Sequence, residues 1–290
     1  MSAEWPPRGE NHTPSGGGEA ATPQAWGEQA TAPPAPHVRV AYENQRFLES
    51  DDARPVRILA EYLEPLKRFR DYRIHDTIVF YGSARVTPEG TLGRYYGDAR
   101  ELARLVTAWS KGLASHAHRY VVCTGGGPGI MEAANRGASD AGGRTIGLNI
   151  VLPHEQQPNP YVTRELAFEF HYFFMRKLWF AHLAAALVAF PGGFGTLDEI
   201  MEILTLAQTR KLARRVPVLL YGSEYWNEIV NFKALVRHGV IAPEDMELFD
   251  FADTPQAALD VLVAKIEAAP GEATPAFAAS RTPPASDLLR

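Results

Sequence analysis

The segment Pro191-Gly192-Gly193-Phe194-Gly195-Thr196-Leu197-Asp198-Glu199 constrains this chain more than any other. It follows an uninterrupted apolar run, 184–190, which is typical of a strand buried on both faces of a parallel sheet. The glycines let a ligand approach the backbone, and a helix starting near Thr196 presents free N–H groups and the positive end of its dipole. The segment therefore predicts an anion site of the kind that holds a phosphate group.

A purely structural explanation of the same segment stays open at this point. Thr196 and Glu199 have the spacing of a capping box, in which each side chain satisfies a backbone N–H group at the helix start. We favour the functional interpretation because other motifs of the chain point to the same chemistry.

Composition excludes several classes of protein. With 290 residues and 46% hydrophobic content, the chain has room for one good-sized domain plus tails. A net charge of -5 argues against nucleic acid or a membrane surface as partners, but it allows a small acidic ligand. The one cysteine, Cys123, lies in an apolar run and fits a core position in a reducing compartment. We expect a cytoplasmic protein, since 1–36 carries no signal-peptide pattern. We also expect no metal and no cofactor, because the sequence suggests no metal-binding cluster.

The order of the predicted elements gives an α/β fold. Short apolar strands alternate with amphipathic helices from Thr77 onward, which predicts a Rossmann-like, doubly wound parallel sheet in a single domain. We expect strands at 77–81, 120–124, 145–150, 185–190 and 216–221, and helices near 95–116, 130–141, 171–183, 196–209, 225–238 and 255–268.

The domain is expected to span 44–269, between disordered tails at 1–43 and 270–290. Its first part, 44–76, is predicted to be a helical extension, broken into pieces by Pro55 and Pro65. The expected buried stripe of this extension consists of Phe47, Leu48, Ile58, Leu59, Tyr62, Leu63, Leu66 and Phe69.

Two further turns of small residues follow predicted strands. One is the run Gly125, Gly126, Gly127, Pro128, Gly129, and the other contains Ser83. Neither is a clean dinucleotide fingerprint, and no Walker lysine follows either long glycine loop, so a P-loop phosphoryl transferase is disfavoured. Because the carboxyl ends of parallel strands share one edge of the sheet, these turns and the Pro191 loop should converge on one crevice.

A cationic pair interrupts an otherwise apolar helix. Arg176 and Lys177 lie within the run Phe173 to Phe180, where a buried guanidinium needs a carboxylate or phosphate partner. Adjacent helical positions diverge by about 100°. We therefore expect Arg176 to point inward and Lys177 to lie along the helix surface. The alternative, a structural arginine paired with a helix carboxylate, stays open.

Taken together, these motifs resemble the LONELY GUY family, the cytokinin riboside 5'-monophosphate phosphoribohydrolases, whose bacterial members are often labelled lysine decarboxylase-like or AMP nucleosidase. The resemblance covers roughly residues 77–222 and suits a longer bacterial branch. It implies a phosphate loop at Gly192, Gly193, Gly195 and Thr196, catalytic roles for Glu199 and Arg176, and Lys177 beside them. Many members have Met where this chain has Phe173, which leaves base preference open.

The resemblance implies an enzyme that hydrolyses the N-glycosidic bond of a purine nucleoside 5'-monophosphate, either AMP or a cytokinin-type nucleotide. Free base and ribose 5-phosphate are the products. We add Gly125, Gly126, Gly127 and Ser83 as candidate substrate-binding residues. A homodimer or higher homo-oligomer is also implied. The alternative is a nucleotide-binding or sensor protein without turnover, which would use the same glycine loops.

Overall fold

The computed structural model describes residues 40–113, 118–151, 157–212 and 216–268, and the chain divides into two compact units, Met1–Asn44 and Gln45–Arg290. The described part of the first unit holds a 3-10 turn, η1 (Ala41–Glu43). Apart from 40–43, the tails predicted at 1–43 and 270–290 lie outside the described residues, so the predicted domain boundaries stay predictions.

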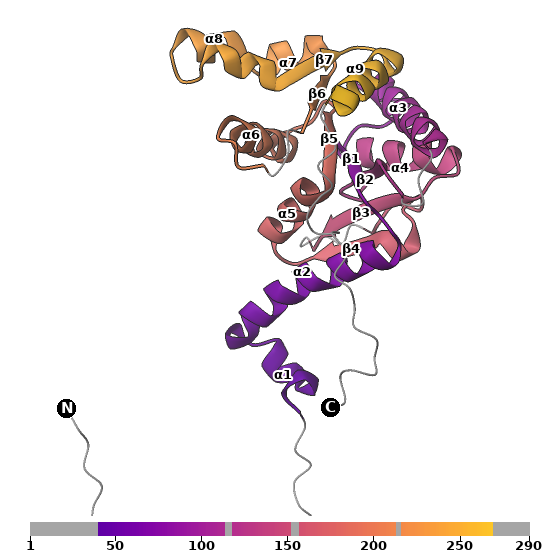
Figure 1. Cartoon of the computed structure of the whole chain (residues 1–290), viewed down its shortest axis with the longest axis vertical. Helices are drawn as coiled ribbons and strands as arrows, with labels where there is room; N and C mark the ends of the chain where they lie inside the picture. Colours follow the sequence, from indigo (N-terminus) through magenta and orange to yellow (C-terminus); the bar gives the residue numbers. More distant parts are fainter. Residues whose placement is uncertain (1–39, 114–117, 152–156, 213–215, 269–290) are drawn as a thin grey trace, which may run out of the picture. The chain divides into compact units, whose positions relative to one another are not determined.

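The second unit is built on a seven-stranded sheet in which every paired strand runs parallel (Figure 1). The strand order is β4-β3-β2-β1-β5-β6-β7, so the order reverses between β1 and β5. This arrangement confirms the predicted Rossmann-like α/β class. The strands are β1 (Thr77–Tyr81), β2 (Val121–Thr124), β3 (Thr145–Ile150), β4 (Ala167–Phe170), β5 (Ala184–Ala189), β6 (Val218–Tyr221) and β7 (Phe249–Ala252).

Helices cover both faces of the sheet, and each face has its own apolar core. One core packs the sheet against α3 (Gly93–Gly112), α4 (Ile130–Asp140) and α9 (Pro255–Ala268). The other packs it against α2 (Arg54–Asp71), α5 (Phe173–Leu183), α6 (Phe194–Gln208), α7 (Ser223–Ile229) and α8 (Phe232–Arg237). The short elements are α1 (Gln45–Leu48), η2 (Asp51–Ala53), η3 (Arg164–Leu166) and η4 (Pro243–Leu248). None of the described helices is long and apolar enough to cross a membrane.

The strands that the sequence predicted are more deeply buried than the strands that it did not predict. All residues of β1, β2, β3, β5 and β6 are buried, as expected for inner strands of a parallel sheet. The sequence analysis missed β4 and β7, which form the two edges and carry partly exposed residues. The segment predicted as one helix at 225–238 is two helices, because the chain turns at Asn231, whose side chain caps α8.

The helical extension is broken next to Pro55, as predicted, because α2 begins there, but it is not broken at Pro65. α2 continues through Pro65, which has no N–H group for the carbonyl of Glu61, four positions earlier. That carbonyl instead accepts the indole N–H group of Trp179 at 2.9 Å. The predicted break at Pro65 is wrong, because a tertiary hydrogen bond replaces the missing helical one. The predicted stripe is only partly buried: Leu66 and Phe69 are in the core, while three of its members are exposed, namely Phe47, Leu59 and Leu63.

Candidate functional site

The carboxyl ends of β1 and β5 lie side by side where the strand order reverses, which is where open parallel sheets bind their ligands. The backbone N–H group of Ser83, after β1, donates to the carbonyl of Pro191, after β5, at 3.0 Å. The N–H group of Ile130, which opens α4, donates to the carbonyl of Ser83 at 3.1 Å. The structure therefore joins the three small-residue turns at one edge of the sheet.

The outer glycines of the Pro191 loop leave its backbone uncovered. A Cβ atom on Gly193 or Gly195 would meet nothing within 4 Å, and the Phe194 side chain between them is 93% exposed. α6 begins at Phe194, two residues before the predicted start, so Gly195 lies in its first turn. The first N–H groups of a helix have no intrahelical partner. Here they form an open surface at the positive end of the helix dipole.

The inner part of the same loop is tightly packed. A Cβ atom on Gly192 would come within 2.2 Å of Thr196 Oγ1, so only glycine fits there. The hydroxyl of Tyr225 donates to the carbonyl of Gly192 at 2.9 Å. No side chain caps α6 at Gly193, and the Glu199 carboxylate accepts a hydrogen bond from Arg176. The capping-box explanation of Thr196 and Glu199 is therefore wrong.

Arg176 and Glu199 form a nearly buried ion pair between α5 and α6. Nη1 of Arg176 lies 3.3 Å from Oε1 of Glu199, and each side chain is 13% exposed. Nε of Arg176 donates to the carbonyl of Leu148, in β3, at 2.7 Å. The guanidinium also lies 5.0 Å from the centre of the Phe180 ring. The arginine that the sequence pointed inward does point inward, and its partner is the carboxylate of the glycine-loop helix.

The surroundings of Glu199 change its proton affinity. Burial raises the pKa of Glu199 to about 7, and the adjacent Arg176 guanidinium limits that rise. Asp198 and Glu202 add to the rise in pKa, whereas Lys177 opposes it. A carboxyl group with this pKa exchanges its proton near neutral pH, which suits general acid or base catalysis.

The second glycine turn contacts the ion pair where Gly125 meets Arg176. A Cβ atom on Gly125 would lie 2.4 Å from Nη2 of Arg176, so the guanidinium rests directly against the Gly125 backbone. Gly126 and Gly127 are buried, and their carbonyls both accept the side-chain amide of Asn159 at 3.0 Å. Gly125 therefore borders the ion pair, while Gly126 and Gly127 are held by hydrogen bonds from Asn159.

Lys177 faces carboxylates rather than the loop. Its Nζ atom lies 2.7 Å from Oδ2 of Asp198 and 2.9 Å from Oε2 of Glu202, both on α6. A cavity of about 120 Å³ lies here between α5 and α6, and its lining includes Tyr81, Lys177 and Glu199. Lys177 thus balances the acidic side of α6 next to Glu199.

Three residues at the site were missed by the sequence analysis: Tyr81, Asn159 and Tyr225. Tyr81 ends β1 just before the Ser83 turn, and that position at a strand end is a signal that could have found it. Asn159 and Tyr225 reach the glycine turns from distant segments, and no local pattern marks them.

The remaining candidate reactive side chains are two histidines and the cysteine. His171 is exposed, and the His182 ring packs edge-on against Trp179. Cys123 is buried, and burial raises the pKa of its thiol, as expected for a core residue. Within the described ranges, no group of three or more His, Cys, Asp or Glu side chains could hold a metal ion.

Comparison with known proteins identifies the family. A probable cytokinin riboside 5'-monophosphate phosphoribohydrolase of Oryza sativa subsp. japonica is 30% identical over 198 residues, which are 67% of this chain and 85% of that protein. The chain belongs to the LONELY GUY family. A second LONELY GUY relative, the cytokinin riboside 5'-monophosphate phosphoribohydrolase of Rhodococcoides fascians, is 28% identical over 51% of this chain and 76% of its own length.

A family model and two solved structures also match this LONELY GUY chain. The family described as "Possible lysine decarboxylase" matches residues 131–262. Among solved structures, the molybdenum cofactor binding protein of Rippkaea orientalis has a TM-score of 0.46 at 22% identity, over 67% of this chain and 98% of that chain. The molybdenum cofactor carrier protein of Chlamydomonas reinhardtii has a TM-score of 0.44 at 25% identity, over 66% of this chain and 99% of that chain.

Proposed function

We propose that this protein hydrolyses the N-glycosidic bond of a purine nucleoside 5'-monophosphate, giving free base and ribose 5-phosphate. The observation that carries the proposal is the nearly buried ion pair between Arg176 of α5 and Glu199 of α6. The same helix α6 begins at the uncovered backbone of Gly193 and Gly195. The names of the relatives, cytokinin riboside 5'-monophosphate phosphoribohydrolases, support the same reaction.

The start of α6 is the proposed phosphate site. Backbone N–H groups of Gly193, Phe194 and Gly195 would donate to phosphate oxygens at the positive end of the helix dipole. Thr196 would fix the conformation of the loop, because its side chain packs against Gly192. Glu199 lies one helical turn beyond Gly195, on the same side of α6. A phosphate held at the loop therefore places the ribose near the carboxylate.

Glu199 is the proposed catalytic carboxylate. The C1'–N9 bond breaks as the base departs, and positive charge develops on the ribose ring, as in glycoside hydrolysis. The ionised carboxylate stabilises that charge and takes a proton from the attacking water. The water oxygen forms the new bond to C1', and the proton that Glu199 has taken from the water passes on to the departing base, which restores the carboxylate. Binding energy from the phosphate, which does not react, fixes this geometry.

Arg176 is proposed to keep Glu199 ready for this reaction. The buried carboxyl group alone would favour its protonated form, and the guanidinium lowers its pKa from that higher value. Gly125 makes room for the guanidinium, so a larger residue there would displace the charge. Ser83 would border the pocket through its bond to Pro191. Lys177 is proposed to act through the charge balance of α6.

The proposal includes a homodimer or higher homo-oligomer. Exposed apolar side chains lie on the helices of the site, at Phe173, Phe174, Leu178 and Phe194. A symmetric contact over these residues would cover them and close the site from solvent. Analytical ultracentrifugation of the full chain tests the oligomer. The cytoplasmic location stays a prediction from the sequence.

One assay tests the proposed reaction. Purified protein is incubated with AMP, an N6-isopentenyl analogue of AMP, and adenosine, and free base and ribose 5-phosphate are measured. The proposal predicts base release from at least one monophosphate and little from the nucleoside. If the monophosphates bind but no base is released, the protein is a nucleotide-binding or sensor protein instead.

A further inference from the structure

The helix that carries Arg176 is capped by a side chain from the N-terminal extension. No side chain of its own caps α5 at Tyr172. Instead the Glu61 carboxylate, on α2, accepts the backbone N–H group of His171 at 2.8 Å and that of Tyr172 at 3.3 Å. A carboxylate at a helix N-terminus satisfies free donors and interacts favourably with the helix dipole.

The same residue of α2 contacts α5 a second time, beyond Arg176. The backbone carbonyl of Glu61, freed by Pro65, accepts the indole N–H group of Trp179 at 2.9 Å. Trp179 is 2% exposed, and its ring stacks on Tyr62 with 5.5 Å between centroids. Glu61 therefore holds α5 both before and after Arg176.

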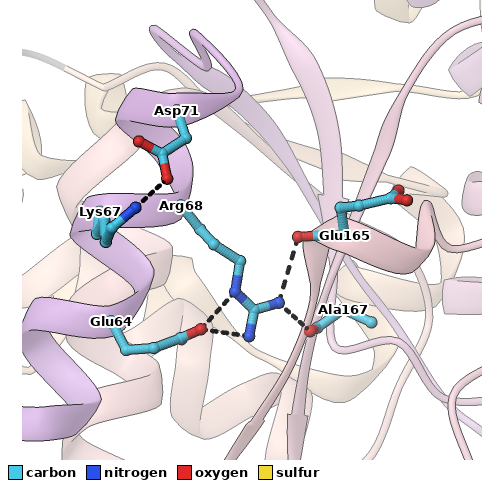
Figure 2. Close-up of polar contacts among 6 residues, drawn as sticks. All are labelled: Glu64, Lys67, Arg68, Asp71, Glu165 and Ala167. Carbon is cyan, nitrogen blue, oxygen red and sulfur yellow. Dashed lines mark hydrogen bonds and ion pairs between the residues drawn. The ribbon is translucent and has the colours of Figure 1, made fainter.

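α2 is itself fixed to the edge of the sheet (Figure 2). The Arg68 guanidinium donates to the carbonyl of Glu165 at 3.2 Å and to that of Ala167, the first residue of β4, at 2.9 Å. Glu64, one turn earlier on α2, pairs with the same guanidinium. β4 leads through His171 and Tyr172 into α5, so α2 clamps both elements of one strand-to-helix connection.

We propose that Glu61 is a positioning residue for the site, which sets through α5 where the Arg176 guanidinium meets Glu199. This inference rests on the proposed function for its kinetic consequence, but not for its structural one. Glu61 does not contact the ion pair, and its effect passes through the placement of α5. If α5 is held less firmly, the Arg176 guanidinium moves away from Glu199. Its positive charge then favours the ionised form of the carboxyl group less strongly.

The test uses the full chain with Glu61→Gln and Trp179→Phe. A glutamine can accept only one of the two N–H groups, because its amide NH₂ faces the other donor. Trp179→Phe keeps an aromatic ring but leaves the Glu61 carbonyl without its donor. The matched control is Asp71→Asn, which also neutralises an acid of α2 but one that pairs with Lys67 at the surface.

Two readouts are needed. The first is the pKa of Glu199, followed by NMR of side-chain ¹³C-labelled glutamate and assigned by the signal that is absent in Glu199→Gln. The second is kcat and KM for AMP across pH. Both test variants should raise the Glu199 pKa by about 0.5 unit and lower kcat about 10-fold with a smaller change in KM. Asp71→Asn should match the wild type in both.

The outcomes separate the two proposals. A Glu199 pKa that stays at the wild-type value in folded Glu61→Gln and Trp179→Phe overturns the positioning role, even if thermal stability falls. If the wild type releases no base from any monophosphate, the proposed function fails. In that case the shift of the Glu199 pKa alone still decides the role of Glu61.

Discussion

The Arg176 guanidinium lies 3.3 Å from the Glu199 carboxylate, across two helices whose paired residues are 23 positions apart in sequence. Both side chains are 13% exposed, so each charge is the main compensation for the other. Removing one partner of such a pair leaves an uncompensated buried charge. The pair therefore links catalysis, pH dependence and stability, and each can be measured separately.

Glu199→Gln should bind AMP but lose most turnover. The amide keeps the size of the side chain, but it carries no charge and accepts no proton from water. A loss of kcat of at least about 10²-fold is expected, with the Kd for AMP changed much less. Steady-state kinetics and calorimetric titration with AMP measure the two. Wild-type turnover in this variant would remove Glu199 from the mechanism.

Arg176→Ala should weaken both AMP binding and turnover, and it should shift the pH profile. Arg176 lowers the pKa of Glu199, so its loss raises that pKa further above the present value of about 7. Activity that needs the ionised carboxylate then appears only at higher pH. The acid limb of kcat/KM against pH reports this shift. Arg176→Lys keeps the positive charge but lacks the several N–H donors of the guanidinium. This variant should therefore return the acid limb of the pH profile toward its wild-type position, while kcat recovers less.

Ionisation of Glu199 should lower the stability of the folded protein at neutral and alkaline pH. Its pKa in the folded protein, about 7, lies above the ordinary value of 4.5, so the folded state binds this proton more tightly. The proton on Glu199 therefore stabilises the folded state fully below about pH 4.5, and this stabilisation is lost as pH rises through about 7. The free energy of unfolding of Glu199→Gln, measured with urea, should therefore increase relative to that of the wild type as pH rises from about 4 to about 8, by on the order of 2 kcal/mol. A difference that does not vary with pH contradicts this.

Two glycines of the same loop should respond in opposite ways. Gly195→Ala meets open space within a helix, where alanine is favoured by up to about 1 kcal/mol, so stability should hold or rise. The added methyl group lies on the uncovered face, so the KM for AMP should increase. Gly192→Ala drives Cβ into Thr196 and should cost about 1–3 kcal/mol. Thermal unfolding and kinetics on both variants check the contrast. An unchanged KM in Gly195→Ala would move the phosphate site elsewhere.

The inner strands of the fold could be predicted because a strand that is buried on both faces consists of a continuous run of apolar residues. β1, β3 and α9 occur with the predicted bounds. The edge strands β4 and β7 carry polar residues such as Glu169 and Asp250, so their patterns look like loops. The continuity of α2 depends on a hydrogen bond from Trp179, more than a hundred positions away, which no local rule contains.

The candidate site was partly predictable for the same reason. A glycine loop between a strand and a helix, and an arginine in an apolar helix, are local patterns with a physical meaning. That Arg176 meets Glu199, and that Gly125 gives it room, follows from the strand order. The contacts of Tyr225, Asn159 and Glu61 come from elements whose packing has no local signature.

The central claim is that the loop amides hold a phosphate and thereby place the ribose against Glu199. A crystal structure of Glu199→Gln with AMP tests it most directly. The phosphate should accept hydrogen bonds from the N–H groups of Gly193, Phe194 and Gly195, with C1' within reach of a water held by the side chain at position 199. A phosphate bound away from the start of α6, or a C1' atom turned away from that side chain, would contradict the account.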